Sequence, residues 1–204
     1  DAASNDWRAA SADPDAKPEW LNAVVGQLAE RIQININRAA DVNPINLLAL
    51  VLLATPKHAM AEGDLLTQLE LSKALVEDLP YSDRITLTPM NPAAIIAYGE
   101  QMGWIERVQH PLGDVLTVSG EKAVLLSYFR NNVLHLMASA AWVACCFLNN
   151  RRMSRDAILR LGKIIYPFIQ GELLLPWDDA GFEQQLQATI DFFVRRGLLE
   201  SAND

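Results

Sequence analysis

Residues 122–150, KAVLLSYFRNNVLHLMASAAWVACCFLNN, form the longest apolar stretch of the chain and carry a polar group in its first half. The polar residues are Arg130, Asn131 and Asn132, with His135 about one turn further on. A continuous helix of this length would span about 40 Å, enough to cross a domain. Its apolar part is shorter than the roughly 20 residues of a membrane span. The pattern therefore favours a buried central helix, with an interfacial or membrane-spanning helix as the alternative.

The composition indicates a globular chain with a net negative charge. Half of the 204 residues are hydrophobic, and the formal net charge is −8. Such a chain can bury a substantial core, and its charge opposes binding to a phosphate backbone. Cys145 and Cys146 are adjacent in the apolar stretch, and neighbours on a helix point about 100° apart. We interpret them as small core residues in a reducing compartment, not as a disulfide or a metal site.

The residues before this stretch predict a lead-in, helices and a β-hairpin. Residues 1–17 are small and acidic, as is typical of a linker or a disordered lead-in. Apolar residues at helical spacing then predict an amphipathic helix from Pro18 to about Ala40. These apolar residues are Leu21, Val24, Val25, Leu28, Ile32 and Ile36.

Three further helices and a hairpin are predicted in residues 18–119. Asn43-Pro44 and Asn91-Pro92 each read as a cap followed by proline at the first helical position. The predicted helices cover residues 45–54, 62–79 and 92–102, and two short strands flank a turn at residues 110–113. Helix, helix, helix, hairpin is the order of a winged-helix module.

The last part of the chain predicts a similar helical order. We expect one helix from Ser154 that kinks or ends at Tyr166-Pro167, and another from about Gly181 to Arg196. We interpret residues 151–204 as a second, truncated winged-helix-like module. The expected fold class is mainly α, with winged-helix-like modules and a small β-hairpin around a long central apolar helix at residues 120–150. We also expect the chain to be a portion of a longer protein.

Catalytic and metal-binding patterns are absent from the sequence. Asp64 follows His58 after five intervening residues, and Asp114 follows His110 after three, so neither pair has the four-residue spacing of an HxxxxD acyltransferase motif. No glycine-rich phosphate loop, nucleophile elbow or metal-spaced cluster occurs. We expect no catalytic residue, no metal and no cofactor in this chain.

The charges also oppose a role in DNA binding. The predicted third helix, PAAIIAYGEQM, contains one glutamate and neither lysine nor arginine. A recognition helix needs basic or polar side chains aimed at phosphates and base edges. We therefore expect no nucleic-acid partner.

Two groups of residues are candidate sites. Arg130, Asn131, Asn132 and His135 either form a satisfied polar network or contact another domain or a phosphorylated ligand. The second group is basic and consists of Arg151, Arg152, Arg155, Arg160 and Lys163. Five bases against one acid, Asp156, make this segment +4. It suits an anionic membrane surface or an acidic protein partner, or it is an ordinary solvated helix start.

Four stretches carry a resemblance to a known family. They are VNPINLLALVLLAT at 42–55, LPYS at 79–82, LLSYFRNNVLHLM at 125–137 and SRDAILRLGKIIYPFIQGELLLPWD at 154–178. Their order and spacing resemble the C-terminal region of bacterial PlsB-type glycerol-3-phosphate acyltransferases, from about Trp20 to Leu199. YFRNN with the following leucine- and histidine-rich segment is the most specific piece.

The resemblance implies an enzyme that transfers a fatty acyl group from acyl-carrier protein or coenzyme A to the 1-hydroxyl of glycerol 3-phosphate. The product is lysophosphatidic acid, which begins phospholipid synthesis. In this family the histidine of an HxxxxD motif is the base, and no position here matches it. The resemblance therefore implies an upstream catalytic domain as partner, together with acyl-carrier protein and the anionic cytoplasmic face of the bacterial inner membrane.

As hypotheses, the Arg130 to His135 group packs on the catalytic domain, and Arg151, Arg152 and Arg155 meet lipid or carrier protein. The alternatives are a non-enzymatic helical interaction module and a winged-helix DNA-binding regulator.

Overall fold

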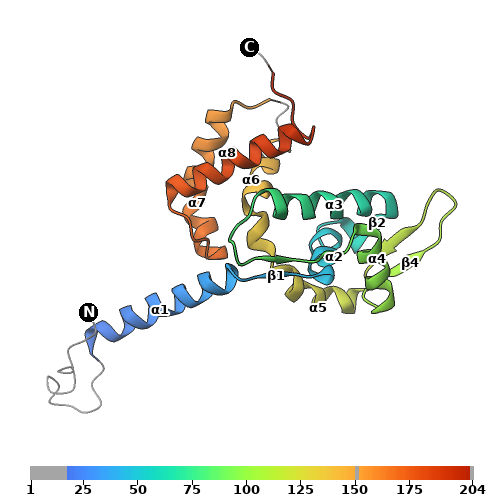
Figure 1. Cartoon of the computed structure of the whole chain (residues 1–204), viewed down its shortest axis with the longest axis horizontal. Coiled ribbons are helices and arrows are strands. Elements are labelled where there is room, and N and C mark those ends of the chain that lie inside the picture. Colours follow the sequence, from blue (N-terminus) through green and yellow to red (C-terminus); the bar gives the residue numbers. More distant parts are fainter. Residues whose placement is uncertain (1–17, 150–151, 203–204) are drawn as a thin grey trace.

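Two hydrophobic cores organise the computed structural model, which describes residues 18–149 and 152–202 (Figure 1). The first core is built mainly by α2 (Pro44–Leu52), α3 (Glu62–Asp78), α4 (Pro92–Gln101) and α5 (Gly120–Asn131). The second is built mainly by α6 (Ala138–Cys146), α7 (Arg155–Leu173) and α8 (Asp179–Arg195). The mainly helical fold class is confirmed.

The first core has the topology of a winged-helix module. Along the chain come α2, β2 (Ala59–Ala61), α3, α4, β4 (Glu106–Val108) and β5 (Val115–Thr117), and the antiparallel sheet has the order β2-β5-β4. The predicted hairpin is confirmed as β4 and β5, while β2 was not predicted. A second, parallel pair, β1 (Asp41–Val42) with β3 (Thr86–Leu87), was also missed.

The predicted helix starts at α2 and α4 are confirmed by their caps. The Asn43 side chain accepts hydrogen bonds from the backbone amides of Ile45 and Asn46, both at 3.0 Å. The Asn91 side chain accepts one from the amide of Ala94 at 2.8 Å. Proline follows each cap, where its missing N–H costs nothing.

The single long helix predicted for residues 120–150 is wrong. In its described part, α5 ends at Asn131, the short 3-10 helix η3 spans Leu134–Met137, and α6 begins at Ala138. The break has an identifiable cause at the Phe129 carbonyl, which accepts a 2.7 Å hydrogen bond from the buried Asn46 side chain. In a continuous helix that carbonyl would accept from the amide of Val133, which instead donates to Arg130.

The break divides the stretch between the two cores. Val133 and Leu136 are buried in the first core, whereas Ala138 and Val143 of α6 are buried in the second. Residues 152–202 contain α7 and α8 and no strand, and α6 packs with them. Within residues 120–149 the cores therefore meet near residue 137, and the end of α3, with Ala74 and Leu75, is also buried in the second core. The truncated second wing stays a prediction.

Two smaller expectations are also corrected. Helix α7 continues through Pro167 to Leu173, so an end at Tyr166-Pro167 is wrong, while a kink there stays a prediction. Of the two cysteines, Cys146 is buried and Cys145 is exposed, because neighbouring helical positions point in different directions.

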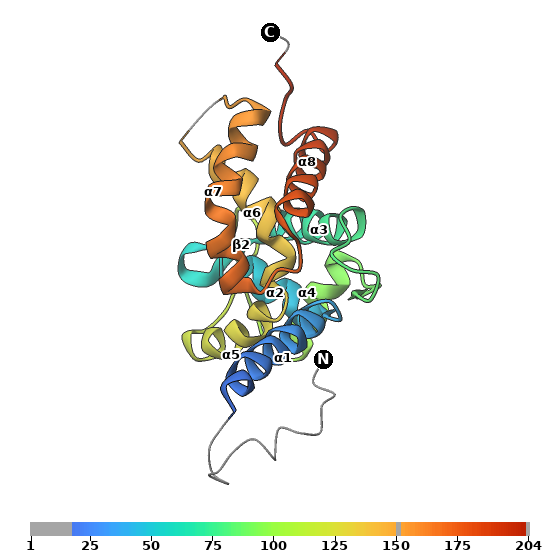
Figure 2. The same ribbon diagram turned by 90° about the vertical axis from the view of Figure 1, so that its left-hand side faces the viewer.

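Helix α1 (Glu19–Asn37) confirms the predicted amphipathic helix, but it projects away from both cores (Figure 1). In Figure 2, which is turned by 90°, α1 points toward the viewer. Its C-terminal end joins the body beside the end of α7, where the Asn37 side chain donates a 2.8 Å hydrogen bond to the Leu173 carbonyl. The expected linker, residues 1–17, lies outside the described residues.

Candidate functional site

The predicted cluster at Arg130 to His135 is divided by the break in the long helix. The Arg130 guanidinium donates to the Asn131 side chain at 3.1 Å, and Asn131 and Asn132 are exposed. His135 lies in η3 and is only 3 % exposed. The structure therefore brings Arg130 and Asn131 together at the surface and places His135 in the interior.

His135 occupies a buried position beside the end of α1. Its Nε2 lies 3.0 Å from the Asn37 carbonyl oxygen, and since a carbonyl only accepts, Nε2 carries the proton. Burial lowers the pKa of His135, and the bond to the Asn37 backbone opposes this only in part. The imidazole is therefore neutral near pH 7, as a buried histidine without an acidic partner should be.

Two aromatic rings meet next to His135. Tyr81 lies edge-on to His135 with ring centroids 4.9 Å apart, and edge-on to Trp177 at 5.0 Å. We call Tyr81, His135 and Trp177 the aromatic junction. Each comes from a different one of the stretches that carry the family resemblance, at 79–82, 125–137 and 154–178. The sequence alone does not show that these stretches meet in space.

The Trp177 end of the junction is fixed by hydrogen bonds from α7. The Trp177 carbonyl accepts bonds from the Tyr166 hydroxyl at 2.6 Å and the Gln170 amide at 2.8 Å. Tyr166 is buried and stacks on Phe182 of α8, with centroids 3.9 Å apart. Burial raises the pKa of Tyr166 to about 12, so this hydroxyl stays a donor at neutral pH.

The aromatic junction is suited to joining elements and not to proton transfer. Burial raises the pKa of Tyr81 and lowers that of His135, so both stay neutral at pH 7. The Tyr81 hydroxyl has no hydrogen-bond partner among the described residues. Together the three side chains hold the end of α1, the loop after α3 and the loop between α7 and α8.

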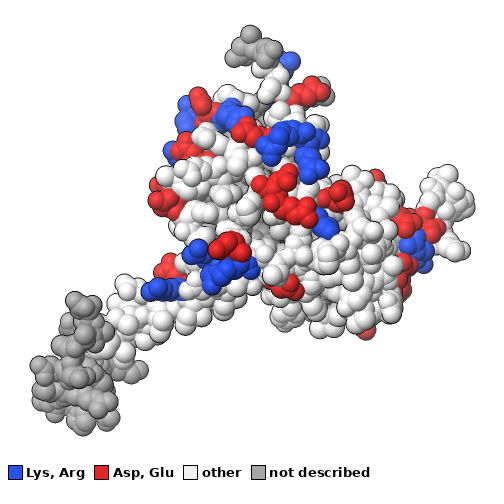
Figure 3. Space-filling model, viewed as in Figure 1, with Lys and Arg blue, Asp and Glu red and all other residues white. Residues whose placement is uncertain are grey.

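The predicted basic segment is partly neutralised by α8. Arg155 pairs with Asp191 at 2.8 Å and Lys163 with Glu183 at 2.6 Å, while Arg151 lies outside the described residues. Arg152 and Arg160 are exposed and form no ion pair with any described residue. On the face in Figure 3, positive and negative side chains are interspersed over the α7 and α8 end of the molecule.

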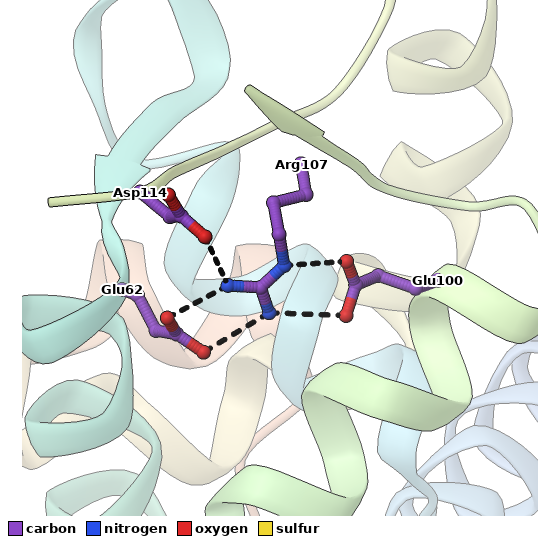
Figure 4. Close-up of polar contacts among 4 residues, drawn as sticks. All are labelled: Glu62, Glu100, Arg107 and Asp114. Atoms are coloured by element: carbon purple, nitrogen blue, oxygen red, sulfur yellow. Dashed lines mark hydrogen bonds and ion pairs between the residues drawn. The ribbon is translucent and has the colours of Figure 1, made fainter. Parts of the chain in front are cut away.

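A further charged group at the wing was missed by sequence reasoning. Arg107 of β4 binds three carboxylates, Glu62 at 2.7 Å, Glu100 at 2.9 Å and Asp114 at 3.1 Å (Figure 4). Hydrogen bonds from Arg107 lower the pKa of Glu62. This wing cluster ties the hairpin to α3 and α4, and with three acids against one base it would repel a phosphate backbone. Arg107 and Glu62 lie 45 positions apart, so only the fold reveals the cluster.

Metal-binding clusters and membrane-spanning helices are both absent from the described residues. No group of His, Cys, Asp or Glu among them is placed to hold a metal ion. None of the helices in the described part of the chain combines the length and the apolar character needed to cross a membrane.

Comparison with known proteins places the whole chain in one family. Residues 1–204 match the family described as glycerol-3-phosphate acyltransferase C-terminal region. The chain belongs to this family. It is 59 % identical to a glycerol-3-phosphate acyltransferase of Xanthomonas axonopodis pv. citri (strain 306) over 98 % of this chain. The resemblance carried by the four stretches is thereby confirmed.

Other relatives with the same name extend the comparison. A protein of Xylella fastidiosa (strain M23) is 58 % identical over 98 % of this chain, and one of Pseudomonas fluorescens (strain SBW25) is 38 % identical over 100 %. The chain spans only 22 %, 23 % and 24 % of the length of these three relatives. The glycerol-3-phosphate acyltransferase region described here is therefore about a quarter of such proteins.

Proposed function

We propose that this chain works as the C-terminal region of a glycerol-3-phosphate acyltransferase in phospholipid synthesis. The whole protein would transfer an acyl group from acyl-carrier protein or coenzyme A to the 1-hydroxyl of glycerol 3-phosphate. The observation that carries the proposal is the match of all 204 residues to the family, together with relatives that bear the enzyme's name. No cofactor is needed for this reaction, since the thioester is already activated.

The role proposed for this region is to support a catalytic domain that precedes it. His135 is buried and neutral, and the described residues present no base oriented by a carboxylate. The aromatic junction and the two cores instead provide a packed surface on which another domain can rest. Arg130 and Asn131, at the surface beside the break, remain the candidate contact of this body with that domain.

Acyl transfer to radiolabelled glycerol 3-phosphate tests both statements. The assay compares the full-length protein, the same protein without this region, and this region alone. We expect activity in the full-length protein only. Full activity after the deletion would contradict the supporting role, activity of the isolated region would contradict an upstream catalytic site, and an inactive full-length protein would contradict the enzyme assignment.

A second candidate role, contact with a membrane, is favoured by the outer face of α7. Its buried side chains line one face, and Leu161, Ile164 and Phe168 lie on the opposite face with exposed fractions of 46 %, 70 % and 73 %. Arg160 lies on the same turns and has no ion-pair partner among the described residues. An apolar face flanked by arginine suits the surface of an anionic bilayer, such as the cytoplasmic face of the bacterial inner membrane.

Sedimentation of the full-length protein with phosphatidylglycerol vesicles tests this role. Ile164→Glu with Phe168→Glu should reduce the bound fraction. Leu112→Glu, at the exposed tip of the wing, is the matched control and should not. Unchanged binding of the double variant would contradict the membrane role, and a raised KM for acyl-carrier protein with unchanged binding would assign this face to the carrier.

A further inference from the structure

Helix α1 carries a continuous apolar row that no described part of the chain covers. Five of its six members are spaced four residues apart, and because successive members turn by about 40° the row winds slowly along one side of the helix. Its exposed fractions lie between 41 % and 64 %. It consists of Trp20, Val24, Val25, Leu28, Ile32 and Ile36, and we call it the α1 stripe.

The attachment of α1 is confined to its last turn. Asn37 bonds Leu173 and His135, and the Asn35 side chain accepts a 3.3 Å hydrogen bond from Arg84. Every residue from 22 to 33 is exposed. The hydrogen bonds within an isolated helix add little to its stability in water. An apolar face of this extent on a solvent-exposed surface indicates a site that binds another protein segment or a membrane.

We propose that the α1 stripe packs against the part of the longer acyltransferase that precedes this region. The relatives leave more than three quarters of their length outside the match. The preceding polypeptide would join the chain on the α1 side, because α1 is the first described helix. The inference rests on the proposed function in one respect, namely that this region is part of such a protein.

The charge and size of α1 favour the preceding part of the polypeptide over an anionic bilayer or a second copy of the chain as the binding partner of the α1 stripe. An anionic bilayer attracts helices rich in lysine and arginine, whereas α1 contains Glu19, Glu30 and Arg31 and no lysine; the shaft shows few charged side chains on the face in Figure 3. A second copy would meet only six stripe residues, fewer than the roughly 20–30 residues a side of a stable interface. A segment of the same polypeptide needs no such area, because its effective concentration is high.

Site-specific photo-cross-linking in the full-length protein tests the proposal. Benzoylphenylalanine replaces Leu28 in the stripe, and in the control it replaces Gln33, which is exposed on the same helix about 140° away. Irradiation at position 28 should link to a peptide that precedes residue 1 in the same polypeptide, whereas position 33 should not. A product of twice the mass, a lipid adduct, a link confined to this region, or equal yields at both positions would overturn the proposal.

A variant pair supplies an independent readout. Leu28→Glu with Ile32→Glu should lower the thermal midpoint of the full-length protein and speed proteolysis before this region, while Gln33→Glu should leave both unchanged. Equal midpoints and proteolysis for the double variant and the wild type would overturn the contact. Acyl transfer is measured on the same samples to distinguish the proposed function from the proposed contact. A cross-link from position 28 in a full-length protein without activity would contradict the acyltransferase function but support the contact of the α1 stripe.

Discussion

At the residue scale, His135 makes stability depend on pH. Its folded-state pKa is lowered from 6.5 by burial, so the unfolded chain binds the proton first as the pH falls. The free energy of unfolding should therefore decrease as the pH drops below about 6.5 and level off below the folded pKa. Urea unfolding of the His135→Gln variant should show this slope reduced, with His110→Gln in the exposed wing turn as control. The same slope in His135→Gln and the wild type would contradict a buried, neutral imidazole.

Two glycines of α7 differ in what surrounds them. A Cβ on Gly162 would lie 2.6 Å from Leu186 and 3.1 Å from the Trp142 indole nitrogen, whereas nothing lies within 4 Å of one on Gly171. Gly162→Ala should cost about 1–3 kcal/mol through overpacking, and Gly171→Ala should gain about 0.5–1 kcal/mol. Thermal unfolding of both variants measures this, and a shift of the same sign in both would refute close packing of α7 on α8.

At the element scale, Asn46 decides where α5 stops. Its side chain accepts a hydrogen bond from the Asn43 amide and donates one to the Phe129 carbonyl, so Asn46→Ala leaves these two part-buried groups without their partner. We expect a cost of about 2–3 kcal/mol in urea unfolding, while Asn131→Ala at the exposed end of α5 should be near neutral. Equal effects would mean that local propensity, and not the bond from α2, ends the helix.

The wing cluster holds the hairpin on the helices. Arg107→Ala removes all three carboxylate contacts, and because these side chains are 27–39 % exposed, solvent screening limits the expected loss to about 1–2 kcal/mol. Lys122→Ala, which breaks the more exposed pair with Glu106, is the control and should have a smaller effect. The Arg107 contribution should also vanish as the pH falls below 4.5 through the lowered pKa of Glu62. A loss that persists in strong acid would exclude an electrostatic origin.

At the scale of the whole molecule, the aromatic junction couples the two cores. Calorimetry of the wild-type chain should show one unfolding transition. Trp177→Ala should separate it into two, because Trp177 contacts Tyr81 across the boundary. Trp104→Ala removes a contact with Phe129 within the first core and should lower the midpoint without splitting it. A single transition in Trp177→Ala would show that other contacts couple the cores.

The sequence predicted local features better than contacts between distant elements. Asn43-Pro44 and Asn91-Pro92 predict the starts of α2 and α4 because a cap and a proline act within one helical turn. The break after Asn131 could not be predicted, since its cause is Asn46, 83 positions from Phe129. The wing cluster and the aromatic junction could not be predicted either, because their members lie far apart in the sequence. The apolar row of α1 was recognised, but periodicity does not say whether a face meets this chain's own core.

The anchoring of α1 through Asn37 makes this helix a lever arm. Its 19 residues span about 28 Å, so a rotation of about 10° at the anchored end moves the far end by about 5 Å. Small changes in the fit around His135 are thereby magnified into displacements of whatever the helix carries. The buried contacts of Asn37 therefore set the direction of α1. A mutation of these contacts would displace a partner bound along α1, even though the mutated residue does not touch that partner.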